Sequence, residues 1–183
     1  MRRQIIARVA AMDPADRATQ EIALRSILET LDGFSRARSV LLYASGFPEE
    51  VATGPMIVRA LRLGKRVILP RVDPALGRLR LHAVEDPAVD LIPGYRLIPE
   101  PGPSCREVEP SAIDWALVPG LGFDRRGYRL GRGAGHYDRL LPTLRPGVPT
   151  WALILDAQWV AEVPTEPHDR RLGGVADHRR VVA

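Results

Sequence analysis

The run RLGRGAGHYDRLL (residues 129–141) holds three alternating glycines, three arginines and one aspartate directly before an expected helix. Such a density of glycine suits a backbone that must adopt unusual torsions or approach a ligand closely. The backbone N–H groups of such a run can face an anion, and arginine guanidinium groups bind phosphate oxygens in a forked geometry. The positive N-terminal end of the following helix would point to the same place. The run therefore predicts a phosphate-binding loop.

Common phosphate and nucleophile motifs do not fit this run. A Walker A loop needs GxxxxGK followed by Ser or Thr, and no lysine lies nearby. The dinucleotide fingerprint GxGxxG fails because its third glycine, Gly135, comes one residue early. The run contains no serine for a nucleophile elbow. Asp138 instead adds a carboxylate beside the expected phosphates, where Mg²⁺ would bind. The alternative interpretation is a glycine-rich turn that carries surface arginines.

The elements that must position this loop alternate between strands and helices. Apolar runs of strand length predict strands at 39–45, 65–70, 115–120 and 150–155, with an alternating edge strand at 78–84 and a last strand at 179–183. Capping and periodicity predict helices from Asp13-Pro14 to Gly33, from Thr53 to Gly64 and near 136–144. Residues 86–112 are rich in proline and glycine, which predicts an excursion over the surface.

The order of these elements predicts an α/β fold and the place of its site. A strand, a helix and a strand within about thirty residues form a βαβ unit, which implies a parallel sheet. We therefore expect one domain over residues 1–183, with a mostly parallel, twisted sheet flanked by helices in Rossmann-like layers. Ligands of such sheets bind beyond the carboxyl ends of the strands. The loops 45–52 and 119–135 both leave carboxyl ends, so Glu49, Glu50 and the glycine loop should share one rim.

Length and composition limit the class of protein. The 183 residues are 45% hydrophobic and 26% charged, which is ordinary for one globular domain. No apolar run approaches the ~20 residues of a membrane helix, and the N-terminus does not resemble a secretory signal. The single cysteine, Cys105, fits a reducing cytoplasm. The net charge of +4 comes from scattered residues, and aromatic content is 5%, so nucleic-acid binding is not favoured. We expect a cytoplasmic monomer that binds neither membranes nor nucleic acid.

The segment VPGLGFDRRGYRLGRGAGHYDRLL (118–141) resembles the signature of the 5-formyltetrahydrofolate cyclo-ligase family, roughly PGxxFDxxGxRLGxGxGYYDR. The matching residues are Pro119, Gly120, Phe123, Asp124, Gly127, Arg129, Leu130, Gly131, Gly133, Gly135, Tyr137, Asp138 and Arg139. Weaker matches are EVAT (50–53), GKRVILPRV (64–72), EP (100–101) and VPTEPHD (163–169). The resemblance implies an α/β fold. It also implies that ATP and Mg²⁺ are used to cyclise 5-formyltetrahydrofolate to 5,10-methenyltetrahydrofolate, with release of ADP and phosphate after phosphorylation of the formyl oxygen.

The resemblance also implies a role for each matching residue. The ATP-binding residues would be Arg2, Arg129, Leu130, Gly131, Arg132, Gly133, Ala134, Gly135, His136 and Tyr137. The folate, which could carry a polyglutamate tail, would contact Ser45, Glu50, Arg132, Gly133, Ala134, Gly135 and His136. Asp138 and Asp169 would hold magnesium, and Arg132 and Asp138 would be the catalytic residues. Glu50 would face the pterin, with Glu49 as the competing assignment because the loop length does not match perfectly.

Three departures from the family pattern affect these assignments. His136 stands where the family usually has tyrosine, and Gly173 stands where a second acid is common. A lysine that the family carries upstream of Arg2 would fall before Met1. Two other functions remain open: a paralogue that acts on another formamide, and a regulator that binds nucleotide or phosphate without catalysis. A zinc site of His136, Asp138, His168 and Asp169 is less favoured, because oxygen ligands beside a phosphate loop favour Mg²⁺.

Overall fold

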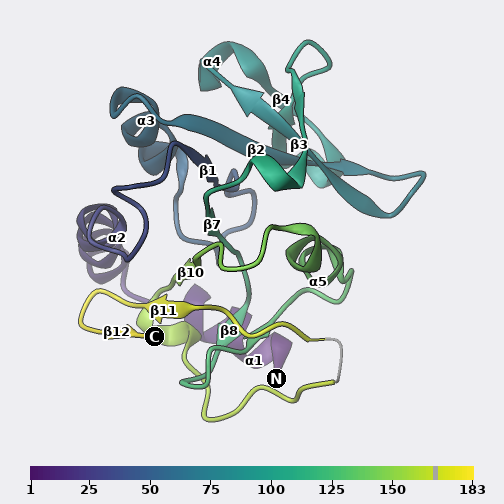
Figure 1. Cartoon of the computed structure of the whole chain (residues 1–183). Coiled ribbons are helices and arrows are strands. Elements are labelled where there is room, and N and C mark those ends of the chain that lie inside the picture. The colour runs from purple at the N-terminus through teal and green to yellow at the C-terminus, as the bar shows by residue number, and fades with distance from the viewer. Residues whose placement is uncertain (167–168) are drawn as a thin grey trace.

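The computed structural model describes residues 1–166 and 169–183. Within these residues, eight strands form the main sheet in the order β12-β11-β10-β7-β1-β2-β3-β6 (Figure 1). The strands are β1 (Ser39–Leu41), β2 (Arg66–Asp73), β3 (Arg78–Val84), β6 (Glu107–Val108), β7 (Trp115–Leu117), β10 (Thr150–Leu153), β11 (Gly174–Ala176) and β12 (Val181–Val182). The neighbouring strands from β11 to β2 in this order pair in parallel, whereas the pairs β2–β3, β3–β6 and β11–β12 are antiparallel. The predicted α/β class with a mostly parallel sheet is confirmed.

Three details of the sheet differ from the sequence prediction. β3 has the expected bounds, but it is not an edge strand, because β6 pairs with its outer side through Leu81 and Val108. The prediction missed β11, because its three residues are too few to show a periodic pattern. β6 was missed for the same reason, since it has only two residues inside the proline-rich excursion.

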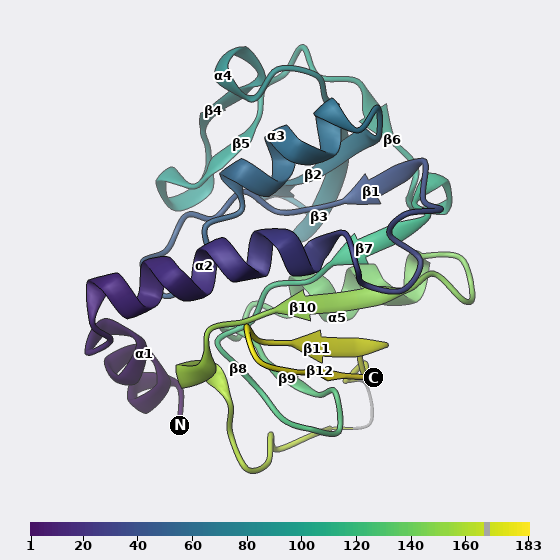
Figure 2. The same cartoon turned by 90° about the vertical axis from the view of Figure 1, so that its left-hand side faces the viewer.

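Helices cover both faces of the sheet. α1 (Arg2–Ala10), α2 (Pro14–Leu28) and α3 (Gly54–Arg62) pack on one face, and α5 (His136–Leu140) packs on the other (Figures 1 and 2). Adjacent strand residues serve opposite faces: Val40 and Leu42 join the core under α2 and α3, whereas Leu41 joins the core under α5. This alternation is the period of two that a sheet buried on both faces requires.

The helix boundaries follow local chemistry. The Asp13 carboxylate caps α2 by accepting the N–H groups of Ala15 at 2.8 Å and Asp16 at 3.1 Å. α2 ends at Leu28 rather than at Gly33, which occupies the following turn with φ +82°. Thr53 precedes α3, but its hydroxyl donates to the Tyr43 carbonyl instead of capping the helix. The predicted helix near 136–144 is α5 followed by the 3-10 turn η3 (Leu141–Thr143).

The remaining segments extend from the main sheet. The excursion 86–112 contains α4 (Pro87–Asp90), the pair β4 (Leu91–Pro93) and β5 (Pro99–Pro101), and the turns η1 (Tyr95–Leu97) and η2 (Pro110–Ala112). A second pair, β8 (Gly122–Phe123) and β9 (Arg129–Leu130), leads into the glycine loop. The turn η4 (Asp156–Gln158) follows β10. No helix in the described part of the chain combines the length and the apolar character needed to cross a membrane.

Candidate active site

A cavity of about 440 Å³ opens beyond the carboxyl ends of the central strands. Its walls come from the loop after β1, the carboxyl end of β2, the β4–β5 pair, residues 129–138 and residues 164–166, together with Asp169 and Arg2. The two loops predicted to share a rim do meet here, because Arg132 of the glycine loop contacts Glu49 of the loop after β1.

The glycine loop has the backbone that its sequence predicts. Gly133 and Gly135 have φ values of +100° and +64°, a left-handed region that side chains strongly disfavour. Arginines of the two neighbouring helices hold the loop: Arg2 Nε donates to the Gly131 carbonyl at 2.8 Å, and Arg139 Nη2 donates to the Ala134 carbonyl at 2.8 Å. The Arg139 guanidinium therefore binds the backbone of the loop itself, and we do not assign it to a ligand.

Arg129 is the most buried cation of the cavity wall. Its side chain is 5% exposed and forms an ion pair with Asp138. Burial lowers the pKa of Arg129, and the nearby Asp138 carboxylate opposes that shift. Among the residues that the structure describes, Arg129 Nε has no hydrogen-bond partner, and neither has the buried hydroxyl of Tyr137. Burial and the nearby Glu50 raise the pKa of Tyr137. Since buried polar atoms are normally paired, these two donors fit a ligand oxygen inside the cavity.

Glu50 is the carboxylate that the loop after β1 turns to the cavity. Its Oε2 accepts the N–H groups of Gly46 at 2.9 Å and Phe47 at 3.2 Å. Burial raises the pKa of Glu50, although these two hydrogen bonds and the Arg132 charge act against it. Arg17 of α2 supports the loop from behind, because its guanidinium donates to the Pro48 carbonyl and to the Glu50 carbonyl.

Two other residues predicted in this loop lie away from the cavity lining. Glu49 is buried and pairs with Arg132, with 2.6 Å between Oε1 and Nη2. The Ser45 hydroxyl accepts the Thr53 N–H at 3.3 Å, and the Ser45 N–H donates to the Thr53 hydroxyl at 3.0 Å. Ser45 thus stabilises the residue that precedes α3. Its predicted contact with the folate stays a prediction.

The two predicted metal ligands line the same cavity. One Asp138 oxygen engages Arg129, which leaves the other oxygen for a cation. Asp169 Oδ2 accepts the Glu166 N–H at 2.7 Å. Across residues 1–166 and 169–183, no group of three or more His, Cys, Asp and Glu side chains is arranged to hold a metal, and His168 lies outside these residues. Two carboxylates fit Mg²⁺, which usually keeps several waters and binds substrate phosphates, better than they fit zinc.

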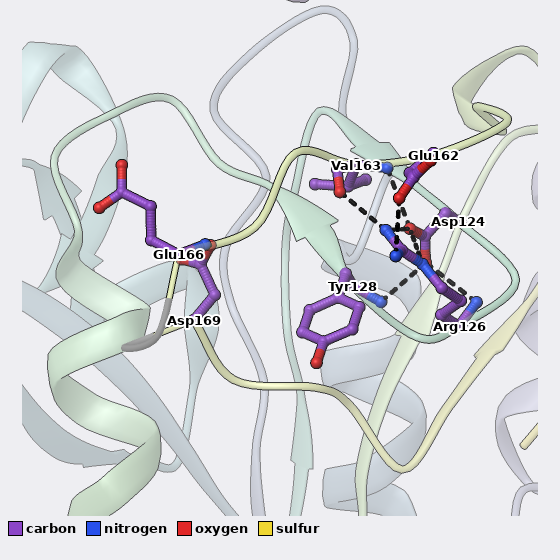
Figure 3. Close-up of polar contacts among 7 residues, drawn as sticks. All are labelled: Asp124, Arg126, Tyr128, Glu162, Val163, Glu166 and Asp169. Atoms are coloured by element: carbon purple, nitrogen blue, oxygen red, sulfur yellow. Dashed lines mark hydrogen bonds and ion pairs between the residues drawn. The ribbon is translucent and has the colours of Figure 1, made fainter.

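Asp124, which the sequence matched without giving it a role, does not line the cavity but stabilises a turn next to it. It is fully buried, and its carboxylate accepts the N–H groups of Arg126, Tyr128 and Val163 at 2.9, 3.1 and 2.9 Å (Figure 3). The bond to Val163 ties the β8–β9 turn to residues 163–166, and the Glu166 N–H in turn donates to Asp169. An aspartate three residues before a glycine predicts such a turn, but it does not predict the long-range bond.

The two residues that depart from the expected sequence pattern, His136 and Gly173, lie in different parts of the structure. His136 lines the cavity, and its pKa is lowered by burial and by Arg139, so its imidazole is neutral at pH 7. Gly173 donates its N–H to the Thr150 hydroxyl at 3.0 Å, and Thr150 begins β10 at the amino edge of the sheet. Gly173 therefore lies at the amino ends of the strands, whereas the cavity lies beyond their carboxyl ends.

Comparison with known proteins gives one consistent family. The sequence model of the 5-formyltetrahydrofolate cyclo-ligase family matches residues 1–177. A 5-formyltetrahydrofolate cyclo-ligase of Mycolicibacterium smegmatis is 34% identical over 161 residues, which cover 86% of this chain and 81% of that protein. The Escherichia coli protein of the same name is 33% identical over 147 residues, covering 79% and 80%. The solution structure of Aquifex aeolicus 5,10-methenyltetrahydrofolate synthetase superimposes with a TM-score of 0.85 at 28% identity, covering 98% of this chain and 89% of that one.

Proposed function

The chain belongs to the 5-formyltetrahydrofolate cyclo-ligase family, and we propose that its cavity closes 5-formyltetrahydrofolate to 5,10-methenyltetrahydrofolate with ATP and Mg²⁺. The observation that carries this proposal is that one cavity combines a loop suited to phosphate with a carboxylate suited to a pterin. A glycine loop with unpaired buried donors suits phosphate, and the Glu50 carboxylate suits the amino and imide N–H groups of a pterin. We further propose that the protein works as a cytoplasmic monomer and that its folate can carry a polyglutamate tail.

The reaction needs activation of a formamide oxygen, which is a poor leaving group. The formyl oxygen attacks the γ-phosphorus of ATP, so that a P–O bond forms while the bond to ADP breaks. N10 of the folate then attacks the formyl carbon, and the C–O bond breaks to release inorganic phosphate. The N10 proton leaves with that phosphate. The products are the methenyl cation, ADP and phosphate, and the protein needs no covalent nucleophile.

The residues of the cavity would position the reactants and neutralise charge. Arg129, Arg132 and the N–H groups of the glycine loop would bind the phosphate oxygens, and Arg2 would fix the loop from the N-terminal helix. The Tyr137 hydroxyl would stay protonated because of its raised pKa and would donate to the same oxygens. Asp138 and Asp169 would hold Mg²⁺, which supplies charge neutralisation during phosphoryl transfer.

The activity itself is tested by the appearance of the methenyl chromophore. Purified protein should convert 5-formyltetrahydrofolate only when both ATP and Mg²⁺ are present, with one ADP and one phosphate released per product. Omission of either ATP or Mg²⁺ is the control. Binding of nucleotide without methenyl product would favour a regulator, and ATP hydrolysis with another formamide would favour a paralogue with a different substrate.

Replacement of Glu50 by glutamine tests the proposed pterin contact. A charged hydrogen bond contributes about 1.5–3 kcal/mol, so Glu50→Gln should raise the folate KM by roughly 10- to 100-fold. The ATP KM should hardly change, because Glu50 lies on the loop after β1 rather than on the glycine loop. Steady-state kinetics with each substrate varied in turn measure both constants. An unchanged folate KM would remove Glu50 from the pterin site.

A further inference from the structure

Arg132 is held by two side chains from one distant loop. Its Nη2 lies 2.6 Å from Glu49 Oε1, and its Cζ lies 3.4 Å from the centroid of the Phe47 ring. Glu49 and Phe47 precede Arg132 by more than 80 residues and belong to the loop after β1. Ion pairing and ring stacking together define both the position and the plane of a guanidinium group.

Glu49 is placed to act on Arg132 and not on a ligand. Glu49 is 6% exposed and is absent from the cavity lining, whereas Arg132 lines the cavity. A buried carboxylate is costly unless it is paired, so the bond to Arg132 has a strong tendency to persist. The adjacent Glu50, by contrast, lines the cavity.

Arg132 needs such support because of where it lies. Its neighbours Gly131 and Gly133 give the backbone wide freedom, and Gly133 has the left-handed φ of +100°. An arginine on such a loop would otherwise sample many orientations. A catalytic group must stay close to its productive geometry, and neighbouring side chains usually lock it there.

We propose that Glu49 is a positioning residue that fixes the Arg132 guanidinium, with Phe47 as the surface on which it stacks. This contact links the loop that carries Glu50 to the loop that binds phosphate. Both substrates are therefore aligned by one loop-to-loop contact. The inference rests on the proposed function, because it assigns Arg132 to the reacting phosphate and formyl groups. It also separates the two neighbouring glutamates: Glu50 contacts the substrate, and Glu49 acts through an arginine.

A double-mutant cycle on the full chain tests this role. Glu49→Gln should lower kcat by roughly 10- to 100-fold, because a misplacement of about 1 Å can cost that much, while the folate KM stays nearly constant. In the Arg132→Ala background the same substitution should change kcat by less than about two-fold, since its target is gone. Glu29→Gln is the matched control, because it breaks an exposed ion pair with Arg59 far from the cavity and should leave kcat unchanged.

Other outcomes overturn the proposal in distinct ways. Additive losses in the two backgrounds would show that Glu49 acts independently of Arg132. A raised folate KM with unchanged kcat would make Glu49 the pterin contact. Urea unfolding of the wild type, the two single variants and the double variant, all without ligand, needs no turnover. If the proposed contact exists, the losses of unfolding free energy in the two single variants should not add up to the loss in the double variant. An inactive wild-type protein would reject the proposed function, whereas absent coupling would reject the positioning role alone.

Discussion

Asp138→Asn is expected to lower Mg²⁺-dependent turnover by roughly 100- to 1000-fold, the usual effect of removing one preorganised charge from a phosphoryl-transfer site. In the proposed site Asp138 would bind two cations, because one of its oxygens engages the buried Arg129 and the other would bind Mg²⁺. Asparagine keeps the size and one carbonyl oxygen but loses the negative charge. The required Mg²⁺ concentration should therefore rise, and kcat measured against Mg²⁺ reports both changes.

A control must separate the metal from the ion pair, because Asp138→Asn also leaves Arg129 without its charge partner. Asp114→Asn is suitable, since Asp114 pairs with Arg145 at 2.7 Å and lies outside the cavity lining. That variant should lose stability while its kcat and Mg²⁺ dependence stay normal. If Asp138→Asn shows normal turnover with a lower melting temperature, Asp138 is a structural residue. Its charge at the start of α5 would then contribute only about 0.3–1 kcal/mol.

Asp124→Asn should lower the free energy of unfolding by about 2–4 kcal/mol, since charged hydrogen bonds and unsatisfied buried donors each cost about 1–3 kcal/mol. One Asp124 oxygen accepts the two turn N–H groups and the other accepts the Val163 N–H. In asparagine one of these oxygens becomes an NH₂ group, so a donor would face a donor at that position. A loss of this size lowers the melting temperature by roughly 5–15 °C in a chain of this length. Chemical and thermal unfolding measure the loss.

The pH dependence of this loss has a defined sign. Burial alone would raise the pKa of Asp124, but the hydrogen bonds from Val163, Arg126 and Tyr128 outweigh it and hold the pKa below its usual value. The stabilisation is therefore fully present above the unfolded-state pKa of about 3.9, and it is lost as pH falls through the lower folded-state pKa. The difference between wild type and Asp124→Asn should shrink in that acidic window.

Asp32→Asn is the matched control for Asp124→Asn, because Asp32 forms an exposed ion pair with Arg36 and should contribute less than about 1 kcal/mol. Asp124→Asn should also raise the Mg²⁺ requirement, because Asp124 holds Val163, and Glu166, three residues later, donates its N–H to the proposed ligand Asp169. A variant as stable as the wild type at pH 7 would contradict the anchoring role of Asp124.

The sequence by itself determined the α/β class, the βαβ unit around α3, and the rim on which the cavity lies. These features follow from local patterns: apolar runs report burial on both faces, and glycines with positive φ report the path of the backbone. The glycine loop was predicted for the same reason, since Gly133 and Gly135 adopt the torsions that their residue type permits. The family signature lies in this same loop.

Only the tertiary structure decided which partner each charged side chain takes. Arg129, Arg132 and Arg139 look alike in the sequence, yet one pairs with Asp138, one with Glu49 and one with the backbone carbonyl of Ala134. The roles of Glu49 and Glu50 separate for the same reason. Residue type and spacing describe neighbours along the chain, whereas the Arg132–Glu49 ion pair depends on atoms that folding brings together from more than 80 residues apart.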